Sequence, residues 1–130
     1  MININYMIEY SYQQKIAMMR ILLDIIHADG YIDAREMHFF KELKELFDLE
    51  EADHQSVKEC NSLLALLQIR NFSEEQKMGF ALYMSKMIVV DGDINDNEVA
   101  IYNVVNEFCS INKGFTENIP QEELKEYTHS

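Results

Sequence analysis

The sequence has 130 residues, of which 48% are hydrophobic, and these values fit one folded domain and exclude an intrinsically disordered chain. It contains only four glycines and one proline, which argues against sandwiches and barrels because those folds need frequent turns. With 23 acidic and 11 basic residues the formal net charge is −12, which argues against binding to nucleic acids or anionic lipid headgroups.

The N-terminal stretch has no basic region followed by an apolar one, and no apolar run approaches the length of a bilayer-spanning helix. We therefore expect a cytoplasmic protein with no membrane insertion. The first helix is expected from about Tyr12 to Ala28. Its polar residues Arg20, Asp24 and His27 fall on one stripe, which is predicted to be the solvent face.

The second helix is expected over residues 34–48 and the third over residues 52–67. Apolar residues recur at helical spacing in both, so these positions are predicted to face the core. They are Met37, Phe40, Leu43, Leu46 and Phe47 in the second helix, and Val57, Cys60, Leu63, Leu64 and Leu67 in the third. Buried free thiols are expected for both cysteines, Cys60 and Cys109.

The fourth helix begins at a capping box formed by Ser73 and Gln76, and it continues to about Val90. It is the most apolar segment and is predicted to be the central helix. A fifth helix is expected over residues 96–109, with inward positions at Val99, Tyr102, Val105 and Phe108. A short helix near residues 121–127 should begin behind Pro120, because proline suits a first helical position.

The fold class predicted from these elements is all-α. No strand-like alternation of apolar and polar residues competes with the helical patterns. We expect a compact bundle of about five to seven helices that forms a single domain over residues 1–130.

An internal repeat at an offset of 62 residues relates residues 28–36 to residues 90–98. Each copy contains Asp-Gly, an isoleucine two residues after the glycine, and a glutamate four residues after the isoleucine. The similarity extends over roughly residues 16–49 and 78–111. The sequence therefore predicts two pseudo-symmetric helix–Asp-Gly–helix hairpins.

Helix ends explain most of this motif. Gly30 and Gly92 fall where a helix ends in a left-handed conformation, which glycine adopts at little cost. Asp33 and Asn95 are suitable N-caps, and the glutamates three residues later would complete capping boxes. Three apolar contacts are also expected. Tyr31 should pack on Ile26 after the glycine, and Ile32 and Ile94 should act as hydrophobic staples on Met37 and Val99.

The charge of the motif has a second interpretation. Four carboxylates, Asp91, Asp93, Asp96 and Glu98, crowd into the second turn, and hard oxygen ligands are what Ca²⁺ or Mg²⁺ requires. The loop is no EF-hand, because residues of a buried helix occupy the positions of the leading carboxylates. Purely structural turns and a weak divalent-cation site both stay open at this point.

The paired motif, Ala28-Asp29-Gly30-x-Ile32-x-x-x-Glu36 and Asp91-Gly92-x-Ile94-x-x-x-Glu98, resembles that of the TerB-like family of bacterial tellurite-resistance proteins. The resemblance covers roughly residues 12–113. It implies an all-α bundle, roles in stress-response or scaffold assemblies, and an acidic face linked to divalent-cation binding. That face corresponds here to Asp29, Asp33, Glu36, Asp91 and Glu98, whereas Asn95 stands in place of an acid.

The candidate metal ligands are thus Asp29, Asp33, Glu36, Asp91, Asp93 and Glu98. No catalytic or cofactor-binding residue is predicted, because the sequence contains no phosphate-binding loop, zinc-protease motif or nucleophile elbow. Glu51-x-x-His54 and Glu126-x-x-His129 have di-iron spacing but lie outside any apolar helix centre. We expect a non-enzymatic module with a protein partner. The alternative, a metal-free structural adaptor, predicts an exposed apolar patch for that partner near Phe115 and Ile119.

Overall fold

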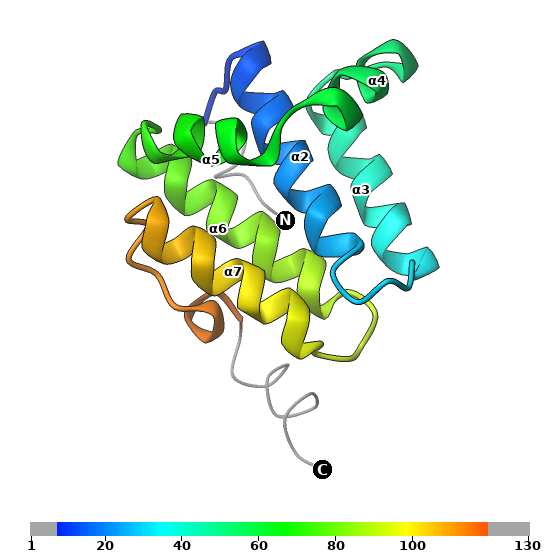
Figure 1. Cartoon of the computed structure of the whole chain (residues 1–130), viewed down its shortest axis with the longest axis vertical. Helices are drawn as coiled ribbons and strands as arrows, with labels where there is room; N and C mark the ends of the chain where they lie inside the picture. Colours follow the sequence, from blue (N-terminus) through cyan, green and yellow to red (C-terminus); the bar gives the residue numbers. More distant parts are fainter. Residues whose placement is uncertain (1–7, 120–130) are drawn as a thin grey trace.

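The computed structural model describes residues 8–119, and in this part of the chain it consists of six α-helices and one short 3-10 helix without a strand. The all-α prediction is confirmed (Figure 1). The elements are α2 (Tyr12–Ile26), α3 (Ala34–Leu46), α4 (Glu51–Glu59), α5 (Ser62–Arg70), α6 (Glu74–Val89), α7 (Asp96–Phe108) and η1 (Phe115–Asn118).

Side chains hold the starts of the two most buried helices. At α6 the predicted capping box is present, because Ser73 Oγ accepts from the Gln76 amide at 3.1 Å and Gln76 Oε1 accepts from the Ser73 amide at 3.0 Å. Ser11 and Gln14 form the same reciprocal pair at the start of α2. Local sequence therefore fixes where both helices begin.

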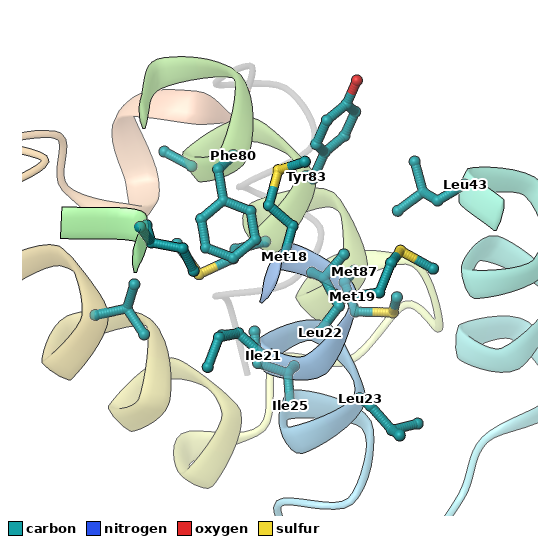
Figure 2. Close-up of a cluster of buried hydrophobic side chains, with 14 of the residues drawn as sticks. Met18, Met19, Ile21, Leu22, Leu23, Ile25, Leu43, Phe80, Tyr83 and Met87 are labelled. Carbon is teal, nitrogen blue, oxygen red and sulfur yellow. The ribbon is translucent and has the colours of Figure 1, made fainter. Parts of the chain in front are cut away.

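The core lies between α2 and α6. Nine of the 15 residues of α2 are buried, and this helix contacts α3, α4, α5, α6 and α7, so it shares the central position predicted for α6 alone. Figure 2 shows Met18, Met19 and Leu22 of α2 gathered with Phe80, Tyr83 and Met87 of α6.

The predicted third helix is wrong, because two helices occupy this region. The chain turns at Cys60, and Asn61 Oδ1 accepts from the amides of Leu63 (2.8 Å) and Leu64 (3.1 Å), which starts a new helix. This rotates the leucines outward, so that Leu63, Leu64 and Leu67 are 61%, 64% and 42% exposed. Ala65 and Ile69 are the buried positions of α5 instead, and Cys60 is only half-buried.

The predicted solvent stripe of α2 is also partly wrong. Arg20 Nη1 donates to the Lys58 carbonyl oxygen at 3.1 Å, and Ser62 Oγ donates to Asp24 Oδ2 at 2.6 Å, so the α4–α5 junction covers both side chains. Only His27 of the stripe is exposed. An Arg–Asp pair thus anchors the end of α4 and the start of α5 on α2.

The burial of several apolar side chains differs from the prediction. Leu46 and Phe108 are 47% and 36% exposed, although both were expected inside. Phe115 and Ile119 are buried, with the Phe115 ring against Tyr102, so they form no surface patch for a partner.

The segment before α2 packs on α6. Tyr10 Oη donates to the Gln76 carbonyl oxygen at 3.0 Å, and Gln76 Nε2 donates to the Glu9 carbonyl oxygen at 2.8 Å. A Cβ atom at Gly79 would lie only 2.5 Å from Tyr10 Oη. Glycine in the middle of α6 therefore provides the space in which the tyrosine lies.

Among residues 8–119 no helix is long and apolar enough to cross a membrane. The predicted helix near residues 121–127, Pro120 and the Glu126–His129 pair lie outside the described residues. The assignment of residues 1–130 to a single domain stays a prediction.

Candidate cation site

The two Asp-Gly turns lie side by side at one end of the bundle, where α2 leads into α3 and α6 leads into α7 (Figure 1). Asn95 Nδ2 donates to Asp29 Oδ2 at 3.1 Å, which joins the second turn to the first. Gly30 and Gly92 have φ angles of 78° and 80°, so both adopt the predicted left-handed conformation. The fold therefore brings both copies of the motif to one face.

The aspartates after each helix have the same backbone partner in both copies. Asp29 Oδ1 accepts from the Tyr31 amide and Asp91 Oδ1 from the Asp93 amide, each at 3.0 Å. These bonds compensate for a carboxylate at the negative end of a helix dipole. Both residues thus have a structural role, whatever else they bind.

The predicted N-caps are confirmed. Asp33 Oδ1 accepts from the Arg35 amide at 2.7 Å, and Asn95 Oδ1 accepts from the Asn97 and Glu98 amides at 2.8 and 3.2 Å. The backbone amide of Arg35 also lowers the pKa of Asp33, because the bond favours the charged form.

The predicted capping boxes at Glu36 and Glu98 are wrong. Both glutamates are buried, with exposures of only 1% and 2%, and neither reaches back to its N-cap residue. Helical spacing could have revealed this burial, because Glu36 lies one turn before Phe40 on the apolar stripe of α3, and Glu98 precedes Tyr102 in the same way on α7.

The two buried glutamates form a carboxyl pair, one from each copy of the motif. Burial raises the pKa of Glu36 to about 7 and that of Glu98 to about 9, and the negative charge of Glu36 adds to the rise at Glu98. The negative charges of Asp29 and Asp91 raise both pKa values further. We call these two side chains the glutamate pair.

One oxygen of each member of the pair, Oε2 of Glu36 and Oε1 of Glu98, is buried without a hydrogen-bond donor. Two buried carboxylates without donors are costly, so the pair requires a shared proton or a positive ion. Hard carboxylate oxygens suit Ca²⁺ and Mg²⁺. As the side chains stand, however, no three His, Cys, Asp or Glu residues within 8–119 are placed to hold a metal ion together. A cation would have to draw the oxygens inward.

The other predicted ligands surround the pair at different depths. Asp91 is half-buried, and this burial raises its pKa. Asp29 and Asp93 lie at the exposed rim, and the charge of Asp93 adds to the rise at Asp91. Tyr31 and Ile32 are 68% and 49% exposed. The packing of these two side chains against Ile26 and Met37, which the sequence predicted, therefore does not cover the acidic residues at the rim.

Neither cysteine has the environment of a nucleophile. Burial raises the pKa of the half-buried Cys60 thiol and raises that of the fully buried Cys109 thiol to about 11. Both thiols are free, as the sequence predicted.

Comparisons with known proteins agree with this architecture. The chain is similar to the crystal structure of a protein of unknown function from Porphyromonas gingivalis, with 23% identity and a TM-score of 0.68 over 85% of this chain and 94% of the other. This likeness concerns the fold alone. No curated protein matches the chain.

The family model described as "Tellurite resistance protein TerB" matches residues 3–59. The matched segment contains the first turn with Asp29, Asp33 and Glu36, and the second turn is related to it through the internal repeat. This match confirms the resemblance to the TerB-like family that the duplicated motif predicted.

Proposed function

We propose that this chain is a non-enzymatic TerB-like interaction module whose paired turns bind a divalent cation, Ca²⁺ or Mg²⁺. Its setting would be a cytoplasmic stress-response or scaffold assembly in a bacterium, with a protein partner. The observation that carries the proposal is the glutamate pair, in which two buried carboxyls, one from α3 and one from α7, each keep an oxygen without a donor.

Helix capping leaves this pair unexplained. Asp33 and Asn95 cap α3 and α7, and Asp29 and Asp91 bind turn amides, so each of these residues has a structural reason to be polar. Glu36 and Glu98 have none, because they cap nothing and occupy positions on apolar stripes. Binding of a cation would explain why two acids are buried next to each other, because the positive ion offsets their negative charge.

The alternative is a metal-free adaptor in which the acidic turns are only helix caps and protons alone reduce the charge of the pair. The two functions differ in what happens above neutral pH, where the pair loses its proton. If the site binds a cation, affinity for Ca²⁺ or Mg²⁺ rises with pH as the proton leaves. If the turns are structural only, no specific affinity appears at any pH.

The test is a two-dimensional amide NMR titration with Ca²⁺ and then Mg²⁺ at about pH 8, which lies above the pKa of Glu36 and below that of Glu98. We expect saturable shifts confined to residues 29–36 and 91–98. The variant Glu36→Gln/Glu98→Gln should weaken binding by about tenfold or more. The matched control Glu45→Gln/Glu107→Gln replaces the same number of carboxyls at exposed positions of α3 and α7 and should change affinity by less than about twofold.

Changing Asp91 and Asp93 to asparagine should also weaken binding while the circular dichroism spectrum stays helical. Shifts spread over every acidic residue, or equal affinity in the double-glutamine variant and its control, would overturn the proposal.

A further inference from the structure

A second surface, away from the acidic turns, is apolar where a surface helix is usually polar. Leu63, Leu64 and Leu67 of α5 are 61%, 64% and 42% exposed, and the helix has no charged residue before Arg70. Single exposed leucines are ordinary, but three within five residues form a patch of the kind that marks protein interfaces. The break at Cys60 and Asn61 creates this patch, since it turns the leucines outward.

A groove runs beside the patch. It has a volume of about 510 Å³ and is lined by α5, by the end of α4 and by the first turns of α2. Its apolar lining includes Leu64 and Ala65 of α5 and Tyr12 and Ile16 of α2, and Cys60 also lines it. We call this cavity, together with Leu63 and Leu67, the α5 groove. Its volume lies within the range of about 300–1,000 Å³ that is typical of binding sites.

The apolar surface continues from the α5 groove to α7. Leu63, Leu67 and Arg70 lie on one stripe of α5, because they are spaced by four and three residues. The guanidinium of Arg70 lies 5.3 Å from the centre of the Phe108 ring, so the stripe ends at an exposed edge of α7. Figure 1 shows α5 near the end of the bundle opposite the acidic turns.

We propose that the α5 groove binds an amphipathic helix from a basic partner protein. Apolar side chains on one face of such a helix would enter the cavity between Leu64 and Ile16 and cover the exposed leucines. This interface is separate from the cation site and does not depend on it.

Charge selects the partner. The chain carries a net charge of −12, and Glu59 lines the groove beside the apolar residues. Two copies of this chain would repel each other, whereas lysine or arginine residues flanking an apolar face would be attracted. The complementary occupant is therefore a helix with leucine-like anchors and a basic opposite face.

The test uses a synthetic helical peptide of about 18 residues, with leucine at positions i, i+3, i+4 and i+7 and lysine elsewhere. Binding is measured by calorimetry on the full chain, in EDTA and about 150 mM NaCl, so that cation binding and weak surface attraction are suppressed. The variant Leu64→Gln/Leu67→Gln leaves the charge and the core unchanged. The matched control Ile32→Gln changes a residue that is 49% exposed at the other end of the bundle.

We expect the leucine variant to bind about tenfold more weakly and the control to stay within about twofold of the wild type. Replacing the lysines of the peptide by glutamates should also cost about tenfold. The half-buried Cys60 provides a second readout, because the bound peptide should slow its reaction with a disulfide reagent while Cys109 stays unreactive in its core position.

Equal affinity of the leucine variant and the wild type would overturn the proposal, as would unchanged Cys60 reactivity. Sedimentation that shows a dimer of the wild type, converted to a monomer by the leucine variant, would identify a second copy as the occupant and would overturn it as well.

Discussion

The two copies of the Asp-Gly turn share their backbone devices but differ in the side chains that they show to solvent. Both have a left-handed glycine, an aspartate that accepts an amide two residues later, and an N-cap side chain. The first copy exposes Tyr31, where the second has Asp93. Only the second copy reaches across, through Asn95 to Asp29. The shared positions build the turn and bury the glutamate pair, whereas the positions that differ determine charge at the rim.

The largest effect that we expect is a pH dependence of the free energy of unfolding that the glutamate pair causes and the other residues of the turns do not. Glu36 and Glu98 have pKa values of about 7 and 9 in the folded chain, above their ordinary value of 4.5. The folded state therefore holds these protons more tightly, and the stability that they contribute is lost as pH rises from about 5 through 7 and 9. Each unit of pKa corresponds to about 1.4 kcal/mol.

Urea unfolding of the wild type should accordingly show a free energy of unfolding that falls between about pH 6 and pH 9. The Glu36→Gln/Glu98→Gln variant should lack most of this fall. The lowered pKa of Asp33 acts only below its ordinary value of 3.8 and so does not contribute in this range. Parallel pH profiles for the two proteins would show that the pair is not the titrating element.

The second prediction concerns equivalent core positions of the two copies, Phe40 in α3 and Tyr102 in α7. The Tyr102 hydroxyl donates to the Lys113 carbonyl oxygen and accepts from Asn118 Nδ2. Tyr102→Phe makes the copies alike and leaves the Lys113 carbonyl oxygen without this donor, whereas Asn118 Nδ2 keeps its bond to Ser85 Oγ, so the change should cost about 2 kcal/mol in urea unfolding. An exposed control, Tyr31→Phe, should cost less than about 0.5 kcal/mol. If the two costs are equal, the hydroxyl does not hold the segment after α7.

The third prediction tests the shared glycines. Gly30→Ala and Gly92→Ala should each cost about 1–2 kcal/mol, and by similar amounts, because both residues have positive φ and open space around the missing side chain. Thermal unfolding measures the two changes. Asparagine tolerates this conformation better, so Gly30→Asn should cost less than Gly30→Ala. Unequal costs in the two copies would show that the turns are not equivalent in energy.

The smallest effect concerns the bridge between the turns. Asn95→Asp keeps the N-cap but replaces the amide that donates to Asp29 by a carboxylate, so we expect a loss of about 1 kcal/mol without added cation. Added Ca²⁺ should reduce this loss, since the change brings another hard ligand to the face. Asp33→Asn, which alters the cap of the first copy, should have a smaller effect on unfolding. If Asn95→Asp loses the same stability with and without Ca²⁺, the hydrogen bond between the turns is not part of the cation site.

Helix positions and the repeat were predictable because they rest on local signals. Ser73 with Gln76, the two glycines, and the caps at Asp33 and Asn95 all behave as their sequence context indicates. The break at Cys60 and Asn61 was not predicted, because the apolar run from Leu63 to Leu67 was assigned to the core. Apolarity alone could not show that Asn61 starts a new helix and turns the leucines outward.

The candidate site was only half predictable for a similar reason. Its residues were identified, but Glu36 and Glu98 were interpreted as capping side chains, and only the arrangement of α3 and α7 shows that the two carboxyls meet. Whether two turns 62 residues apart face each other depends on packing across the whole bundle. A single sequence contains no local signal for that distance.

The contact between Tyr10 and α6 has a consequence for the order in which the chain folds during synthesis. The partners of residues 9 and 10, Gln76 and Gly79, leave the ribosome long after them, since 66 residues separate Tyr10 from Gln76. The hydrogen bond of Tyr10 cannot form until α6 has formed, so residues 9 and 10 are among the last parts of the described chain to reach their native contacts. An early nascent chain that ends before residue 76 would contain the ring partners Phe47 and Phe72 but would leave the Tyr10 hydroxyl without its acceptor.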